Sequence, residues 1–483
     1  MHVNLLLENK KCLIVGGGKI ALHKLQLLLK SKAQVHVISP EIQDEIIELQ
    51  NQNKITYDKK YFEESDIADY FLVYASTNSR SINKNILHAC QKKNILCCCV
   101  DGNWSEGDFI TPATTQHNQL TLSISSGGIS CRQSKLVKNT LAKQMPFFDT
   151  AHLVIIGTDH HCLSVEEREG FHLFKEKYEK LGFLLVQLLG IHEFMILNTC
   201  NRIEIIAVTS LETIQNEVIE EIVGFTKLSS KEFYIKKNQQ AFEHLCLVTS
   251  GMLSQTPGEN YITAQVKESL EMAKAKGWAD NMLQEWISSA LFVSKEIKNE
   301  VIVNMKTEDI ESVVMQFLKS KNIQSNDLMI IGTGFLGKKM LEEAVKNFTN
   351  ITWCYHENKP DLPSIDNATI DLVGLESMKK YLHRTICIIN TSAADRYLIS
   401  PNDGLLFDSD RNTYIVDLSV PRAISPLLEK TSKNITLINL DDLKNWNKPG
   451  LCHVYDFLSA SRTIIKNNMS LYEKITYNFQ GRN

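Results

Sequence analysis

Residues 11–30 read KCLIVGGGKIALHKLQLLLK, and this stretch decides the fold of the first part of the chain. The apolar strand Lys11–Val15 leads through three glycines into a segment with apolar residues at helical spacing. Gly16 allows the tight turn, and Gly18 lets a pyrophosphate approach the backbone N–H groups at the start of the helix. A second apolar strand, Gln34–Ile38, follows at the interval of a βαβ unit. We therefore predict a dinucleotide site here rather than a simple glycine-rich turn.

The polar residues that would complete this site lie at the ends of the neighbouring strands. The predicted cofactor contacts are Gly16, Gly18, Lys19, Ile20, Ser39, Pro40 and Thr77. The ends of the strands offer two carboxylates. Glu41 is only a fair candidate for holding the ribose hydroxyls. A later apolar strand at 95–100 ends at Asp101, which is placed either for proton chemistry or as a turn carboxylate.

The composition indicates a soluble globular protein of several domains. The chain has 483 residues, of which 43% are apolar and 22% charged, and at roughly 150 residues per domain it would form about three domains. A net charge of −4 argues against a protein that mainly coats nucleic acid. No apolar run reaches the ~18 residues of a membrane span, and no secretory signal opens the chain. The 12 cysteines form no repeated CxxC pairs, so we expect a cytoplasmic protein with no membrane partner and assign no metal ligand.

Four segments of this first unit resemble the precorrin-2 dehydrogenase module of siroheme synthases. They are VGGGKIALHKLQLLL (15–29), VHVISPE (35–41), CVDGNWSEGDFITPA (99–113) and LTLSISSGGIS (120–130). The resemblance covers residues 1 to about 145 and implies NAD-dependent oxidation of precorrin-2 to sirohydrochlorin. Asp101 would be the general base, both here and in the iron insertion credited to many members. Ser126 and Gly127 would offer backbone N–H groups to the macrocycle's carboxylates, beside Cys131, where the family usually has proline.

NTCNRIE at 198–204 marks a second candidate site. The strand Phe194–Asn198 ends in a turn that carries Cys200, and Arg202 follows two residues later. A guanidinium beside a thiol lowers its pKa, so a reactive thiolate is one prediction. An inert buried thiol is the alternative.

This motif and its surroundings resemble glutamyl-tRNA reductase over residues 152 to about 445. In chain order the matching segments are GTDH (157–160), VEERE (165–169), NTCNRIE, HL (244–245), SG (250–251), GE (258–259) and QVK (265–267). The resemblance implies attack of the Cys200 thiolate on the ester of glutamyl-tRNA, followed by hydride delivery to the thioester to release glutamate-1-semialdehyde. It places His244 near the scissile carbonyl, although a satisfied core histidine is the alternative. The residues expected around the glutamyl group are Thr199, Asn201, Arg202, Glu204, Ser254, Glu259 and Gln265. Leu253 and Tyr261 depart from the family beside the predicted pocket.

GTGFLG at 332–337 is a complete second dinucleotide motif. It follows the apolar strand 328–331 and opens a helix, and its predicted cofactor contacts are Gly332, Gly334, Phe335, Leu336 and Gly337. After the next strand, His356 and Glu357 stand where the reductase family tends to supply an arginine for the 2′-phosphate of NADPH. NADPH is therefore expected at this site, with NADH as the alternative.

We predict an α/β chain of two Rossmann-type dinucleotide-binding domains separated by an α+β catalytic domain, with a short helical C-terminal tail. The expected boundaries are 1–148, 149–305, 306–445 and 446–483. The tail allows one long helix at most, which packs on its own domain or forms a homodimer contact. Its apolar face would comprise Val454, Phe457, Leu458, Ile464, Ile465, Leu471, Tyr472 and Ile475. Trp278 and Trp286 are expected in the core rather than stacked on a tRNA base.

The combined prediction is a bifunctional oxidoreductase of tetrapyrrole biosynthesis, with precorrin-2 and glutamyl-tRNA as its substrates. Two alternatives remain open. In the first, only the dehydrogenase half is active and the reductase half is degenerate or regulatory. In the second, the chain is a haem- or tRNA-binding regulatory protein whose Rossmann units are scaffolds.

Overall fold

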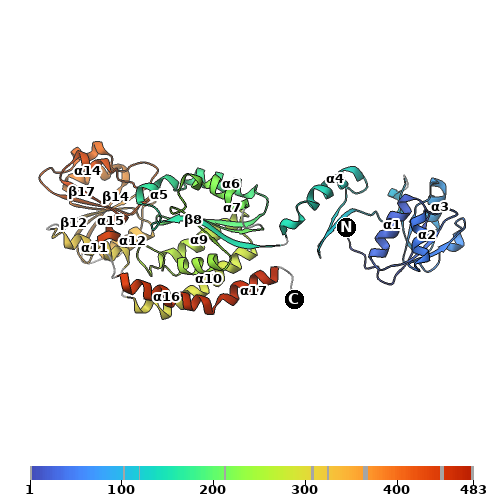
Figure 1. Cartoon of the computed structure of the whole chain (residues 1–483). Coiled ribbons are helices and arrows are strands. Elements are labelled where there is room, and N and C mark those ends of the chain that lie inside the picture. The colour runs from blue at the N-terminus through green and yellow to red at the C-terminus, as the bar shows by residue number, and fades with distance from the viewer. Residues whose placement is uncertain are drawn as a thin grey trace. The chain divides into compact units, whose positions relative to one another are not determined.

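The computed structural model divides the chain into two compact units, Met1–Pro146 and Phe147–Asn483 (Figure 1). The structure describes residues 3–101, 104–118, 120–148, 150–210, 214–305, 309–323, 326–362, 368–446 and 451–479. The side chain of Val454 lies outside the described residues. The first boundary predicted from the sequence, at 148, lies close to the division observed after Pro146. The predicted boundaries at 305 and 445 both fall inside the second unit and stay predictions.

The first unit is built on a five-stranded parallel sheet of order β3-β2-β1-β4-β5. Its strands are β1 (Lys11–Val15), β2 (Gln34–Ile38), β3 (Thr56–Asp58), β4 (Leu72–Ala75) and β5 (Leu96–Cys99). The helices are α1 (Lys19–Lys30), α2 (Asp44–Asn51) and α3 (Arg80–Lys92). A hairpin of β6 (Ala113–His117) and β7 (Leu120–Ile124) precedes α4 (Cys131–Ala142). Apolar clusters pack on both faces of the sheet, because the central strand β1 is apolar at every residue after Lys11.

The second unit begins with a four-stranded antiparallel sheet of order β11-β8-β10-β9. The strands are β8 (His152–Asp159), β9 (Ile191–Asn198), β10 (Arg202–Thr209) and β11 (Tyr234–Lys237). In Figure 1, helices α6 and α7 lie on one side of this sheet and α9 and α10 on the other, so the central strand β10 is buried along its whole length. The helices are α5 (Val165–Phe171), α6 (Lys175–Val186), α7 (Ile214–Val223), α8 (Gln239–Thr249), α9 (Tyr261–Ala275) and α10 (Asn281–Glu300).

A six-stranded parallel sheet of order β14-β13-β12-β15-β16-β17 follows in the same unit. Its strands are β12 (Asp327–Ile331), β13 (Asn350–Tyr355), β14 (Thr369–Gly374), β15 (Cys387–Asn390), β16 (Thr413–Asp417) and β17 (Ile435–Asn439). The helices are α11 (Ile310–Ser320), α12 (Phe335–Ala344), α13 (Leu375–Met378), α14 (Leu427–Thr431) and α15 (Leu440–Trp446). The strand order reverses between β12 and β15, which places a ligand crevice at the glycine turn after β12. The predicted α/β class with Rossmann-type parallel sheets is confirmed.

The tail forms two helices, α16 (Leu451–Asn467) and α17 (Met469–Phe479), so the prediction of one long helix at most is wrong. The break falls at Asn468, whose side-chain amide donates to the carbonyl of Ile464 in the last turn of α16 and to Glu296 of α10. Ile465 and Tyr472 are buried in the core of the catalytic domain, and Tyr472 stacks on Trp286 with ring centroids 5.6 Å apart. The tail thus packs on its own domain, and the homodimer contact stays a prediction.

The sequence predicts a long helical pattern across 265–299 that is interrupted at Gly277, and the structure confirms it with the two helices α9 and α10. Gly277, at φ +69°, ends the first of them in the left-handed region. Trp278 and Trp286 are both buried, which confirms the prediction of core packing.

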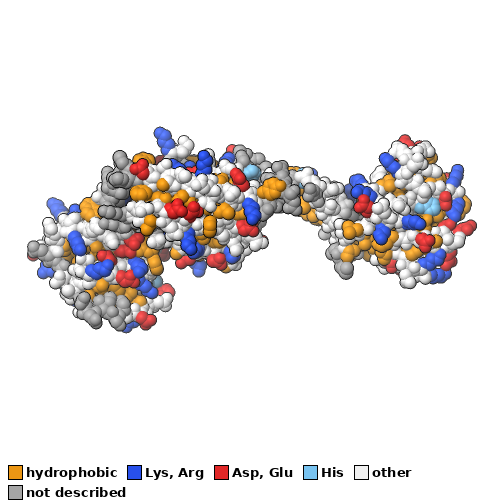
Figure 2. Space-filling view, turned by 90° about the horizontal axis from the view of Figure 1, so that it is seen from below, with side chains coloured by type: hydrophobic (Ala, Val, Ile, Leu, Met, Phe, Trp, Pro, Cys, Tyr) orange, Lys and Arg blue, Asp and Glu red, His pale blue; other side chains and the backbone are white. Residues whose placement is uncertain are grey.

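The surface of the chain carries charges of both signs. On the face shown in Figure 2, basic and acidic side chains are interspersed, in keeping with the net charge of −4. Among the described helices, none is both long and apolar enough to cross a bilayer.

Candidate active site

Cys200 lies on the tight turn that joins β9 to β10. The turn is fastened by Thr199, whose hydroxyl accepts from the backbone N–H groups of Asn201 and Arg202 at 3.2 Å each. The Thr199 N–H in turn donates to the Arg202 carbonyl at 2.9 Å. Thr199 therefore holds the turn in place rather than offering its hydroxyl to a ligand.

A cavity of about 780 Å³ extends from this thiol to the start of α12, the helix that follows the second dinucleotide turn. On the catalytic side it is lined by Cys200, Asn201, Gln255, Thr256, Glu259, Tyr261 and Gln265. On the nucleotide side it is lined by Phe335, Leu336, Lys339 and Leu418. The predicted nucleophile and the predicted hydride-donor site thus share one space.

A fully buried carboxylate, Glu204, organises a polar network next to the turn. Its Oε1 accepts from Arg202 Nη1 at 2.9 Å, Tyr234 Oη at 2.6 Å and His244 Nε2 at 2.8 Å. Burial raises the pKa of Glu204, but the charges of His244 and Arg202 and these hydrogen bonds outweigh it and hold the pKa at about 2. Because the carboxylate is ionised, Nε2 of His244 must carry the proton.

The predicted substrate residues therefore divide into two sets. Cys200, Asn201, Glu259 and Gln265 line the cavity. The other set is buried and is not among the described residues that line the cavity: Thr199, Arg202, Glu204, His244 and Ser254. Arg202 also donates through Nη2 to the Leu253 carbonyl. Leu253 meets the network through its backbone, whereas Tyr261 does line the cavity as the sequence suggests.

The prediction of a lowered thiol pKa is wrong for this arrangement. Burial raises the pKa of Cys200 to about 11, and the charge of Glu259 adds to the effect, against the opposing charges of Arg168 and Arg202. Burial is the main cause, and Arg202 offsets it only in part because its guanidinium is paired with Glu204. Glu259 itself has a raised pKa because it is buried, and the hydroxyls of Ser254 and Thr256 donate to it.

Two residues of the site carried no recognised sequence signal. Tyr234 reaches Glu204 from β11, a pairing that only the sheet register creates. Glu311 lies in the first turn of α11, a position where an acidic residue usually faces water. Instead it is buried, lines the cavity and accepts from Tyr261 Oη at 2.6 Å.

The second glycine turn has the geometry that a dinucleotide pyrophosphate requires. Gly332 has φ +106°, and a Cβ on it would lie 2.6 Å from Thr391 Oγ1. A Cβ on Gly337 would lie 2.1 Å from the Gly332 carbonyl oxygen, so this glycine allows the helix to pack on the turn. Gly334 caps α12 and faces open space, where a phosphate can approach the backbone N–H groups. Phe335 is exposed and packs edge-on against Tyr261, with centroids 5.1 Å apart.

The first glycine turn is built in the same way. Gly16 has φ +126°, and a Cβ on it would lie 2.3 Å from the Ser76 carbonyl oxygen, while Gly18 caps α1 in open space. The exposed Lys19 and Ile20 follow in the first turn of α1. The predicted contacts after the neighbouring strands already form hydrogen bonds within the protein. The Ser39 hydroxyl donates to the Glu41 carbonyl, with Pro40 between the two in sequence, and the Thr77 hydroxyl donates to the Asn83 side chain.

Asp101 lines a separate cavity of about 530 Å³ within the first unit. Asn83 Nδ2 donates to its carboxylate at 2.6 Å, which orients it. The same cavity is lined by Ile20, Ser126 and three lysines, Lys24, Lys135 and Lys138. Gly127 is exposed at φ +63° and is not among the described lining residues.

Comparison with protein families divides the chain in the same order. Residues 156–301 match the glutamyl-tRNA reductase N-terminal domain, residues 313–446 match shikimate/quinate 5-dehydrogenase, and residues 3–113 match an NAD(P)-binding domain.

Relatives match over most of their own length. The glutamyl-tRNA reductase of Thermodesulfovibrio yellowstonii is 27% identical over 316 residues, covering 61% of this chain and 72% of that protein. The glutamyl-tRNA reductase of Clostridium novyi is 28% identical over 308 residues, with 61% and 72% covered.

Two solved structures were matched over part of the chain. One is glutamyl-tRNA reductase from Methanopyrus kandleri, with a TM-score of 0.34, 20% identity, and coverage of 68% of this chain and 79% of that one. The other is SirC, precorrin-2 dehydrogenase, with a TM-score of 0.27, 19% identity, and coverage of 48% and 91%. By its family matches, the chain carries a glutamyl-tRNA reductase N-terminal domain and a nucleotide domain of the shikimate and quinate dehydrogenase type, preceded by an NAD(P)-binding domain.

Proposed function

We propose that the second unit reduces glutamyl-tRNA to glutamate-1-semialdehyde through a thioester on Cys200. The observation that carries this proposal is the single cavity lined by both Cys200 and the first residues of α12, Phe335 and Leu336, which follow the glycine turn after β12. A nucleophile alone would transfer or hydrolyse an acyl group, whereas reduction needs a hydride donor within reach of the same carbonyl.

The thiolate of Cys200 attacks the ester carbonyl, and the ribose oxygen of the tRNA leaves with a proton. Gly332, Gly334 and Gly337 would hold NADPH, which would supply the hydride needed to reduce the thioester to the aldehyde, with the Cys200 thiolate as the leaving group. Asn201 and Gln265, which line the cavity, are placed to orient the glutamyl group.

Glu259 links substrate binding to activation of the thiol. In the free protein its charge raises the pKa of Cys200. The α-ammonium of the glutamyl group would pair with this carboxylate and offset its charge, so the bound substrate itself favours the thiolate.

The test uses the full chain with glutamyl-tRNA and either NADPH or NADH, following semialdehyde formation. Cys200→Ser should abolish the product, while Cys131→Ser, an exposed cysteine in the other unit, should leave the rate unchanged. Product formation by Cys200→Ser at the rate of the unchanged chain would overturn the proposal. So would the absence of product from the unchanged chain with both coenzymes, and that result would favour a degenerate or regulatory second unit.

For the first unit we propose NAD-dependent oxidation of precorrin-2 to sirohydrochlorin, with iron insertion at the same site as a further step. The observation that supports it is Asp101 in a cavity with Lys24, Lys135 and Lys138. These lysines suit a macrocycle that carries many carboxylates, and Asp101 is placed to accept a proton. Asp101→Asn should lose precorrin-2 oxidation and retain reduction of glutamyl-tRNA. A variant that keeps both activities would contradict the assignment.

A further inference from the structure

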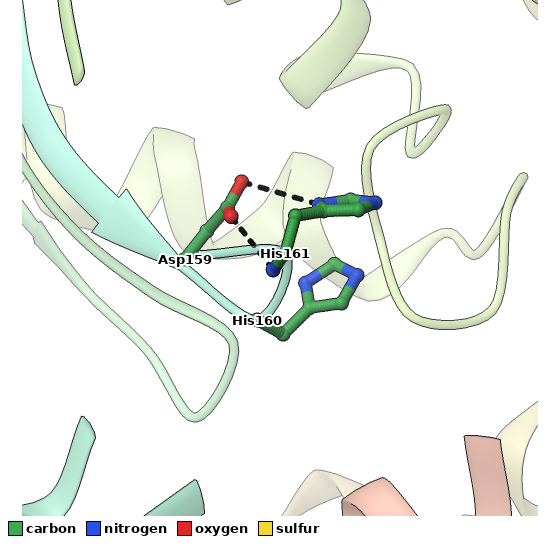
Figure 3. A group of neighbouring side chains, drawn as sticks. All are labelled: Asp159, His160 and His161. Atoms are coloured by element: carbon green, nitrogen blue, oxygen red, sulfur yellow. Dashed lines mark hydrogen bonds and ion pairs between the residues drawn. The ribbon is translucent and has the colours of Figure 1, made fainter. Parts of the chain in front are cut away.

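Three consecutive residues at the end of β8 bring metal-binding atoms together. Asp159, His160 and His161 each offer one ligand atom, and these atoms all lie within 4.8 Å of one another. Figure 3 shows the two imidazoles one above the other with the Asp159 carboxylate beside the His161 ring. Their ring centroids are 4.0 Å apart. The sequence assigned no metal here, because consecutive residues lack the spacing of a known zinc motif.

A buried nitrogen in this cluster has no partner. His160 is only 6% exposed, and its Nδ1 forms no hydrogen bond within the described part of the chain. Leaving a buried polar atom unsatisfied costs about 1–3 kcal/mol. A metal ion at the cluster would remove this cost.

Cys162 follows on the same turn and is half-buried, but its sulfur is not one of the three clustered ligand atoms. One carboxylate oxygen and two imidazole nitrogens are ligands that zinc accepts, and three protein ligands leave the fourth tetrahedral position to a water. The His161 side chain is 54% exposed, so its ring can turn toward a shared ion without displacing the core.

The charges around the cluster are mostly balanced. Arg202 pairs with Asp159 in the sheet register, but its guanidinium is bonded to Glu204. Lys444 donates from α15 to the His160 carbonyl at 3.2 Å, and it is the cation that opposes a bound ion most directly. The negative charge of the Asp159 carboxylate opposes that of Lys444.

We propose that Asp159, His160 and His161 form a binding site for a divalent ion of the zinc class. The site adjoins the turn of the thiol, because the His160 N–H donates to the Asn201 carbonyl at 3.0 Å. A bound ion would therefore fix the backbone on which Asn201 presents its side chain to the cavity. The site does not depend on the proposed reduction, so the two can fail independently.

The test titrates Co²⁺ into the full chain, purified without a histidine tag and freed of metal with a chelator. We expect the visible absorption bands of tetrahedral cobalt with nitrogen and oxygen ligands. His161→Gln should weaken binding by at least about ten-fold, since it removes a direct ligand. His383→Gln, an exposed histidine elsewhere in the unit, and Cys131→Ser should bind as the unchanged chain does.

Two results would overturn the proposal. One is the absence of tetrahedral cobalt bands in the unchanged chain. The other is an equal spectrum and affinity in His161→Gln, which would place the bound cobalt elsewhere. Because the readout is spectroscopic and His161 is exposed on its turn, a loss of catalysis or a folding defect does not imitate either result.

Discussion

The acid–base behaviour of Glu204 gives a prediction about stability. In the folded chain its pKa is about 2, below its ordinary value of 4.5. A carboxyl group whose pKa falls on folding stabilises the fold above its unfolded pKa, and this contribution is lost as the pH falls from 4.5 toward 2. The loss amounts to about 3 kcal/mol at 1.36 kcal/mol per pKa unit.

Glu204→Gln should lower the free energy of unfolding at pH 7 by about 3–5 kcal/mol, because Arg202 is left buried without its counter-charge. The difference in the free energy of unfolding between the variant and the unchanged chain should be smaller at pH 3 than at pH 7. Urea unfolding followed by tryptophan fluorescence measures both, since four of the five tryptophans lie in the second unit. A gap that does not change with pH would contradict the assignment.

The titration of Cys200 gives a second prediction. Glu259→Gln should lower the thiol pKa from about 11 by about one unit, because it removes the charge that adds to burial. Glu268→Gln is the matched control, since Glu268 lines the same cavity but is not among the charges that act on the thiol. The measurement is the rate of alkylation of the Cys200 peptide against pH, by mass spectrometry. Equal titration curves for the two variants would rule out the role given to Glu259.

We expect the residues that follow strand β13 to set the preference between NADPH and NADH. Glu357 follows this strand, its side chain is 81% exposed, and it stands where a carboxylate accepts the ribose hydroxyls and repels a 2′-phosphate. Glu357→Gln should raise the preference for NADPH over NADH by about ten-fold, the effect of losing one like-charge contact. The ratio of kcat/KM for the two coenzymes measures it. Glu376→Gln, an exposed glutamate of the same domain, should leave the ratio unchanged.

The elements that the sequence predicts best are those fixed by local pattern. The bounds of β1 and β2 agree with the prediction residue for residue, because each is an apolar run closed by a turn. The two glycine turns follow from the same local steric demands. The sequence did not predict features that depend on distant partners. These are the hydrogen bonds from Tyr234 to Glu204 and from Tyr261 to Glu311, and the helix break at Asn468, whose side chain donates to Glu296. The raised pKa of Cys200 belongs to this second group, since its cause is burial.

At the level of the whole molecule, each unit has its own apolar cores. The clusters of the first unit pack on the sheet of β1, and those of the second pack on its two sheets. We expect fragments 1–146 and 147–483 to fold separately, with melting transitions that together reproduce the calorimetric trace of the full chain. A fragment that stays unfolded by circular dichroism would show that one unit needs the other.

The two tail helices have a consequence for how the protein behaves at low concentration. α16 and α17 cover α8 and α10 of the same molecule, and Tyr472 packs beside Trp286. The same two helices leave Tyr455 and Tyr477 exposed to solvent. Serial dilution tests whether a second copy covers them: a specific activity and thermal midpoint that fall on dilution would show the predicted homodimer contact, and constant values would contradict it.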